Sequence, residues 1–137
     1  MTKSKFAISV HILTLLTSVK EEWLSSEYIA GSLNMNPVLV RNELSNLKKN
    51  QLVESKEGKG GGVRLAKAAN KITLGDIFTA IKKNHIFGLA KNEPNPKCPV
   101  GNQINRHLTD LFAEVDQVVE EQLHAVSLGD FQERFEF

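Results

Sequence analysis

The side chains whose types and spacing predict the most specific chemistry lie between residues 36 and 49. Val40, Leu44 and Leu47 recur at i, i+4 and i+7, which is the spacing of one buried helical face. The opposite face of such a helix carries Val38, Arg41, Asn42, Ser45, Lys48 and Lys49. Arginine can donate two hydrogen bonds to guanine, and asparagine can pair in the same bidentate way with adenine. We therefore expect this face to contact base edges in the major groove of DNA near its start and phosphates near its end.

Two helices joined by a tight turn are expected to present that face. Ser25 or Ser26 can cap the first of these helices, for which residues 29, 30 and 33 supply an apolar stripe. Asn36 is a good N-cap for the second, in which Pro37 takes the first position because its missing N–H costs nothing there. Asn50 is expected to end this helix in the left-handed conformation. An apolar helix over residues 4–19 precedes both, and its two apolar sides predict contacts with the core and with a partner element.

A glycine-rich hairpin is predicted to follow these helices. Residues 52–55 and 63–65 are typical of short strands, and the glycines within 58–62 indicate a flexible turn between them. Lys56, Lys59 and Arg64 surround this turn. Because glycine lets the backbone approach the sugar–phosphate edge closely, we expect Lys59 or Arg64 to enter the minor groove.

The second half of the chain is predicted to mediate assembly. Thr73 and Asp76 form a capping-box pattern at the start of a short helix, and a proline-rich loop spans residues 84–101. A helix over residues 102–126 would extend on the order of 35 Å, too long for so small a domain to cover. We expect this helix to form a homodimer through its apolar stripe, of which the main members are Ile104, Leu108, Leu111, Phe112, Val115, Val119 and Leu123. Packing of the stripe on its own chain is the alternative.

These elements together predict a mainly α fold with a small β-hairpin: a winged helix-turn-helix followed by a long C-terminal dimerisation helix. We assign residues 1–83 to the DNA-binding domain, 84–101 to a sensor loop, and 102–137 to the dimerisation helix and a final amphipathic tail. The expected DNA-contacting set is Ser25, Ser26, Asn36, Val38, Arg41, Asn42, Ser45, Lys48, Lys59 and Arg64. Within it, residues 38, 41 and 42 are expected to read bases.

The distribution of charge agrees with this division of the chain. Residues 1–75 hold 11 Lys and Arg against 6 Asp and Glu, whereas residues 76–137 hold 6 against 10. A basic half is suited to phosphate, and an acidic half is not. No run approaches the roughly 20 apolar residues of a membrane span, and no small-residue cleavage site follows the first apolar segment. We therefore expect a cytoplasmic protein without a membrane partner.

Several short motifs occur in a specific order along the chain. They are Phe6-Ala7-Ile8 with Leu13, Ser26-x-x-Ile29-Ala30, Asn36-Pro37-Val38-x-Val40-Arg41, Leu52-Val53-x-Ser55, Gly58-x-Gly60-Gly61-Gly62-Val63-x-Leu65-Ala66 and Leu74-Gly75-Asp76-Ile77. With these motifs the whole chain resembles the Rrf-two family of bacterial winged-helix regulators, relatives of the iron–sulfur cluster regulator, the nitrite-sensitive repressor and the cysteine-metabolism repressor. The resemblance implies a homodimeric repressor that binds a palindromic operator in double-stranded DNA.

The cysteine content departs from the pattern of that family. Many members hold an iron–sulfur cluster with three cysteines in the loop before the long helix, whereas this chain has only Cys98 there. The sequence therefore predicts no cluster and no metal site, although His85 and His107 could supplement one thiolate. Lys97 and the following helix N-terminus favour the thiolate form of Cys98. We expect redox sensing by oxidation of Cys98, with a passive loop thiol as the alternative.

Other functions remain compatible with parts of the pattern. A winged helix can serve as a protein-interaction module, and a repressor can sense a small molecule in a pocket between the loop and the long helix. A single-cysteine peroxidase is disfavoured because no residue near Cys98 in the sequence supplies a base or an oxyanion clamp. The sequence therefore predicts a regulator that is not an enzyme.

Overall fold

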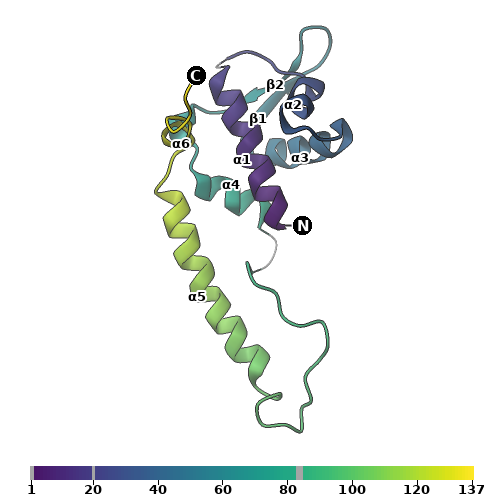
Figure 1. The fold of residues 1–137 in the computed structure, drawn as a ribbon, viewed down its shortest axis with the longest axis vertical. Coiled ribbons are helices and arrows are strands. Elements are labelled where there is room, and N and C mark those ends of the chain that lie inside the picture. The colour runs from purple at the N-terminus through teal and green to yellow at the C-terminus, as the bar shows by residue number, and fades with distance from the viewer. Residues whose placement is uncertain (1, 20, 83–84) are drawn as a thin grey trace.

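The computed structural model describes residues 2–19, 21–82 and 85–137. Its elements are α1 (Thr2–Ser18), α2 (Ser26–Leu33), α3 (Pro37–Lys49), β1 (Val53–Lys56), β2 (Gly62–Leu65), the 3₁₀ helix η1 (Ala69–Lys71), α4 (Leu74–Ile81), α5 (Ile104–His124) and α6 (Leu128–Gln132). The fold is mainly helical with an antiparallel hairpin and a long C-terminal helix, as predicted (Figure 1). Among the described helices, none is long and apolar enough to cross a membrane.

Helix α1 runs through the centre of the N-terminal part of the fold. Its residues Ile12, Leu13 and Leu16 are at most 1% exposed, and α2, α3, α4, α6 and β2 all contact this helix. Burying each of these side chains contributes roughly 1.5–3 kcal/mol to folding. Near the start of α1, Phe6 meets Phe78 of α4 edge to face, with ring centroids 6.0 Å apart. We expected one apolar side of α1 to meet a partner element, and α6 of the same chain is among the elements that contact this helix.

Short-range hydrogen bonds determine where the helices begin. Ser25 caps α2 and Asn36 caps α3, and Thr73 forms the predicted capping box with Asp76 at the start of α4. A cap of this kind satisfies a backbone N–H that has no partner within its own helix. Because each of these pairs lies within three residues of sequence, the capping pattern alone was sufficient to predict these helix starts.

The end of α3 differs from the prediction. Asn50 has a φ of −92° and is not left-handed, whereas Gln51, the next residue, has a φ of 63°. The N–H of Gln51 donates to the carbonyl of Lys48, and the N–H of Leu52 donates to the carbonyl of Leu47, both at 3.0 Å. These two bonds form a Schellman motif, in which the left-handed residue follows the C-cap. The left-handed position therefore falls on Gln51, and the expectation for Asn50 was wrong.

The hairpin is joined to the segment before α2. In the hairpin Glu54 pairs with Arg64 and Ser55 pairs with Val63. Leu24 adds a backbone bridge to Val63, with N···O distances of 2.8 and 2.9 Å. Gly62 has a φ of 147°, and a Cβ at this position would overlap the carbonyl of Leu24. Glycine is therefore required here both by its conformation and by the close approach of the two backbones.

Helix α5 extends beyond the N-terminal part of the fold (Figure 1). Its C-terminal half contacts α4, where Glu120 pairs with Lys82 and His124 lies near Asp76. The N–H of Leu74 donates to the carbonyl of Val126 at 2.9 Å, and the N–H of Leu128 donates to that of Ile72 at 2.7 Å. Leu128 of α6 is fully buried in the same core as α1. The helix covers residues 104–124, a shorter range than the predicted 102–126.

Candidate nucleic-acid interface

Helix α3 buries one face and exposes the other. Val40 and Leu47 are 0% exposed and Leu44 is 7% exposed, so the predicted inward face is correct. The predicted outward side chains all lie on the exposed surface: Val38, Arg41, Asn42, Ser45, Lys48 and Lys49. This face is available to a groove of DNA without any rearrangement of the core that supports it.

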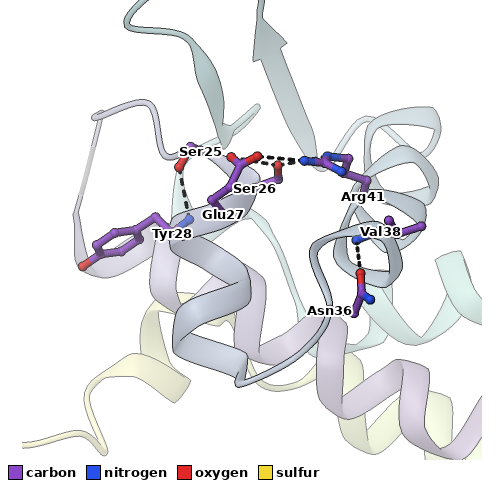
Figure 2. Close-up of polar contacts among 7 residues, drawn as sticks. All are labelled: Ser25, Ser26, Glu27, Tyr28, Asn36, Val38 and Arg41. Atoms are coloured by element: carbon purple, nitrogen blue, oxygen red, sulfur yellow. Dashed lines mark hydrogen bonds and ion pairs between the residues drawn. The ribbon is translucent and has the colours of Figure 1, made fainter.

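Arg41 does not extend freely from α3 but is held by the start of α2 (Figure 2). Its Nη2 donates to Oε1 of Glu27 at 2.7 Å, and its Nε donates to Oγ of Ser26 at 3.2 Å. The hydroxyl of Ser26 in turn donates to Oε2 of Glu27 at 3.3 Å. The pKa of the Glu27 carboxyl lies below its usual range, because its own backbone N–H and the Arg41 guanidinium stabilise the charged form.

Glu27 was not among the residues expected in the interface. An acidic residue in the first turn of a helix is common, because it interacts favourably with the positive end of the helix dipole. This local role gave no indication that Glu27 would pair with Arg41, which lies 14 residues further along the chain. Only the packing of α2 against α3 brings the carboxylate to the guanidinium.

Two other residues of the expected set have structural roles at helix starts (Figure 2). Oγ of Ser25 accepts a hydrogen bond from the N–H of Tyr28 at 3.1 Å, and Oδ1 of Asn36 accepts one from the N–H of Val38 at 2.8 Å. These caps orient the N-termini of α2 and α3 on the exposed surface. Contact of Ser25 and Asn36 with DNA stays a prediction.

The hairpin carries its basic residues in two different environments. Arg64 pairs with Glu54, with 2.6 Å between Nε and Oε1, and its guanidinium lies 4.2 Å from the centroid of the Trp23 ring. Lys56 lies over the same ring at 5.9 Å. Lys59, by contrast, is exposed in the turn. Trp23 was not singled out from the sequence, because nothing local indicated that it would stack against a strand some 40 residues away.

The loop before α5 holds Cys98 at the surface. The Cys98 side chain is exposed, its N–H donates to the carbonyl of Asn95 at 3.2 Å, and its own carbonyl accepts from the N–H of Asn102 at 2.8 Å. Since α5 begins only at Ile104, a few residues in turns separate Cys98 from the helix start that was expected to lie next to it.

A buried carboxylate attaches the first part of this loop to α5. Asp116 is 3% exposed, and its two oxygens accept hydrogen bonds from the N–H of Ile86 at 3.0 Å and from Nδ1 of His85 at 2.6 Å. Lys82 lies 3.4 Å from Asp116 and donates to Glu120 at 2.8 Å. Burial opposes the charge of Asp116, but the hydrogen bonds from Ile86 and His85 together with the nearby Lys82 ammonium outweigh it and lower the pKa of the carboxyl. The sequence analysis did not identify this cluster.

The predicted dimerisation stripe lies along α5 and is partly covered by its own chain. Of the described residues of α5, only Asp116 is buried, while Leu111 is 50% exposed. Two members of the stripe have partners within the chain: Phe112 packs against the rings of His85 and Phe87, and Leu123 packs against the core. Of the remaining members, Leu111 is exposed, and the others are half-buried: Ile104, Leu108, Val115 and Val119.

Comparison with known proteins places this architecture in a family. The family model for Rrf2, described as an iron-dependent transcriptional regulator, matches residues 2–134. The chain belongs to the Rrf2 family. It is also 38% identical over 130 residues to YwnA of Bacillus subtilis strain 168, a candidate HTH-type transcriptional regulator, with 95% of this chain and 96% of YwnA covered. The Rrf2 family is the Rrf-two family indicated by the sequence motifs, so this chain is a DNA-binding transcriptional regulator and not an enzyme.

Solved structures agree with the Rrf2 assignment. A candidate transcriptional regulator from Lactobacillus plantarum matches with a TM-score of 0.79 and 30% identity, covering 96% of this chain and 89% of that one. CymR, the global cysteine regulator of Bacillus subtilis, matches with a TM-score of 0.70 and 23% identity, covering 96% and 95%. At this identity the second match supports the winged-helix fold alone.

The iron dependence in the family description does not fit the donors of this Rrf2 chain. Protein-bound iron–sulfur clusters normally take four ligands, mostly cysteine thiolates. This chain has one cysteine, and the part of it that the structure describes contains no group of three His, Cys, Asp or Glu able to hold a metal. Of the two histidines considered as supplements, His85 is bonded to Asp116 and His107 is exposed on α5. The function proposed below therefore involves no cluster.

Proposed function

We propose that this Rrf2 regulator is a cytoplasmic homodimeric repressor that binds a palindromic operator through α3 and the hairpin. The observation that carries the proposal is the exposed face of α3, which presents arginine, asparagine, serine and lysine side chains opposite the buried apolar stripe. The N-terminal part of such a helix meets base edges in the major groove. The proposal keeps three functional segments: a DNA-binding domain over 1–83, a sensor loop over 84–101 and a dimerisation segment over 102–137.

Each part of the interface has a separate role in this proposal. Val38, Arg41 and Asn42 contact base edges, and the exposed Val38 side chain suits the methyl group of thymine. The positions that contact the sugar–phosphate backbone, or support those contacts, are Ser25, Ser26, Asn36, Ser45, Lys48, Lys59 and Arg64. Trp23 and Glu54 orient Arg64 at the base of the hairpin, which leaves Lys59 at the exposed turn as the basic residue best situated to enter the minor groove.

Dimerisation through α5 is supported by the apolar side chains of this helix that remain exposed. A projecting helix with Leu111 and Val118 at least 50% exposed leaves apolar surface in water, which a second copy of the helix would remove. Analytical ultracentrifugation of Leu111→Glu at several protein concentrations tests this proposal. The control is Thr109→Glu, which introduces the same charge at an exposed position of α5 outside the stripe. A dimeric wild type, a dimeric control and a monomeric Leu111 variant are expected. A Leu111 variant as dimeric as the control would contradict the proposed interface.

Cys98, in the proposed sensor loop between α4 and α5, is proposed as a thiol switch. The Cys98 side chain is exposed. Its sulfur would attack one oxygen of a peroxide and form a sulfenic acid, while the other peroxide oxygen leaves as hydroxide. The loop joins α4 to α5, so a change at Cys98 has a direct path to the orientation of the proposed dimer helix. Release of the operator on oxidation is the expected consequence.

Selection of randomised duplexes by the purified reduced protein, repeated after mild peroxide treatment, tests DNA recognition and the switch together. Enrichment of a palindrome that disappears on oxidation is expected for the wild type, and persistence after oxidation is expected for Cys98→Ser. A palindrome that survives oxidation of the wild type removes the switch and leaves the repressor. No enrichment in either state contradicts specific DNA binding and favours a protein-interaction module. The affinity for selected DNA should also fall steeply with salt, with a slope of about −0.9 per phosphate contact on logarithmic axes.

Sensing of an apolar small molecule is a second candidate, because the fold contains a groove of about 550 Å³ between α1 and the C-terminal tail. Phe6, Val10, Leu15, Phe131 and Phe135 contribute to its lining. The sequence analysis had assigned such a pocket to the space between the loop and the long helix, and this groove lies elsewhere. Operator binding that changes with an apolar compound in Cys98→Ser would favour this candidate.

A further inference from the structure

The hydrogen bonds to Arg41 occupy one edge of its guanidinium group. In the part of the chain that the structure describes, Ser26 accepts from Nε and Glu27 accepts from Nη2. An arginine has five N–H donors, so both donors on Nη1 and one on Nη2 remain. One of the Nη1 donors and the remaining Nη2 donor form the end of the fork, which is a geometry that can contact O6 and N7 of guanine together. The edge of the guanidinium that bonds Ser26 and Glu27 is therefore not the edge that would contact guanine.

The position of this group favours access to DNA. The side chains of Arg41 and Glu27 are 52% and 65% exposed, and Arg41 lies within the first two turns of α3. Figure 2 shows the Arg41 side chain directed from α3 toward the start of α2, where the Ser26 and Glu27 side chains meet it. The Ser26 hydroxyl accepts from Arg41 while it donates to Glu27, so the three polar groups form a closed set of hydrogen bonds. That set holds a long, flexible side chain in one orientation before any DNA is bound.

We propose that Glu27 and Ser26 orient Arg41 to recognise one guanine in each half-site, which makes Glu27 a positioning residue for sequence specificity. This inference rests on the proposed operator binding. A carboxylate near DNA repels phosphate, so Glu27 weakens binding to every sequence by its charge alone. It also partly neutralises Arg41 and prevents that side chain from turning to a phosphate. The net result is lower affinity for random DNA and a larger preference for guanine at one base pair.

The test compares base preference and general affinity in the full-length protein. Duplex selection by the wild type identifies the operator, and duplexes with each base at each position are then titrated with the wild type, Arg41→Ala, Glu27→Gln and Ser26→Ala. Glu57→Gln is the matched control, because it removes the same charge from an exposed position in the hairpin turn. Melting temperatures of all variants show whether each one is folded at the assay temperature.

Arg41→Ala is expected to abolish the guanine preference at one position per half-site. Glu27→Gln is expected to reduce the same preference roughly tenfold, within the range of a bidentate arginine–guanine contact, while its affinity for random duplex rises or stays equal. Glu57→Gln should change affinity for all duplexes alike. In the Arg41→Ala background, Glu27→Gln should have no further effect on base preference, which a purely structural role of Glu27 would not predict.

The inference and the proposed function fail in different ways. A selected palindrome with a guanine preference that Glu27→Gln changes by less than twofold overturns the positioning role alone. A selected palindrome whose base preferences are the same in Arg41→Ala also overturns it, because Arg41 then reads no base. If the wild type selects no sequence at all, both the operator proposal and this inference are wrong.

Discussion

Replacing Asp116 by alanine should detach the first part of the loop from α5. Asp116 is 3% exposed and accepts hydrogen bonds from Ile86 and His85, and Lys82 lies 3.4 Å away. Alanine at this position leaves the N–H of Ile86 without its acceptor and removes a charge that Lys82 faces. Removal of a buried carboxylate that accepts charge-assisted hydrogen bonds is among the more costly single substitutions, even though its partners His85 and Lys82 are partly exposed.

The expected size follows from the bonds that are lost. A hydrogen bond to a charged group contributes about 1.5–3 kcal/mol, so loss of the Ile86 and His85 bonds should cost about 3 kcal/mol if part of the loss is recovered by water. That energy corresponds to hydrogen exchange on the order of 100-fold faster at the Ile86 amide if the loop opens locally. If the loss is felt globally, the melting temperature should fall by roughly 10 °C.

The assay combines amide hydrogen exchange at Ile86 with thermal unfolding, at one protomer concentration throughout because assembly affects apparent stability. Asp110→Ala, which removes an exposed carboxylate from the same helix, is the control and should change neither quantity appreciably. Exchange at Ile86 and a melting temperature that both match the control would refute the reasoning, since the network would then hold neither the loop nor the fold.

The pH dependence of the stability difference between wild type and Asp116→Ala tests the direction of the Asp116 pKa shift. The folded pKa of Asp116 lies below its ordinary value of 3.8. Burial alone would raise it, but the hydrogen bonds from Ile86 and His85 and the charge of Lys82 together outweigh burial. A depressed carboxyl pKa contributes stability that is present above the unfolded pKa and is lost as pH falls through the folded pKa. The difference in free energy of unfolding between wild type and Asp116→Ala should therefore be largest near pH 6 and should decrease below about pH 4. A difference that widens on acidification would contradict the assignment.

Three further predictions concern other parts of the fold. Gly62→Ala should lower the melting temperature, because its Cβ would overlap a backbone carbonyl, whereas Gly31→Ala, with open space around it, should be neutral or stabilise by about 0.5–1 kcal/mol. Asn36→Ala should cost about 1 kcal/mol in urea unfolding through loss of the α3 cap. The hydrogen bond to Glu120 raises the pKa of Lys82 above 10.5, so the stability advantage of wild type over Lys82→Met should persist below pH 10.5 and vanish above the folded pKa.

Much of the architecture could be predicted from residues that act over short distances along the chain. The helical period of Val40, Leu44 and Leu47 predicted which face of α3 is buried, and this face is buried in the structure. The Thr73 and Asp76 spacing predicted the capping box of α4. These patterns are reliable because the interacting groups are three or four residues apart, so helix geometry alone brings them together. The misassigned left-handed residue after α3 is a one-residue error at a helix end, where local preferences of neighbouring positions compete.

The candidate site could be predicted only in part. Arg41 was correctly expected at the surface, but its support by Ser26 and Glu27 requires α2 and α3 to pack at one particular angle. Arg64 was expected near the hairpin turn, but its stacking on Trp23 requires the Leu24–Val63 bridge that draws the two segments together. Neither contact has a pattern in the local sequence.

The sequence by itself determined the order of the elements, the faces that are buried, the family and the single cysteine. The tertiary structure decided which charged side chains meet: Glu27 with Arg41, Glu54 with Arg64, and Asp116 with His85 and Lys82. The physical reason is the range of the forces involved. Hydrophobic periodicity and capping depend on neighbours within one or two helical turns. An ion pair or a hydrogen bond needs its atoms within about 3–4 Å, a condition that residues 10 to 34 positions apart meet only after the core has packed.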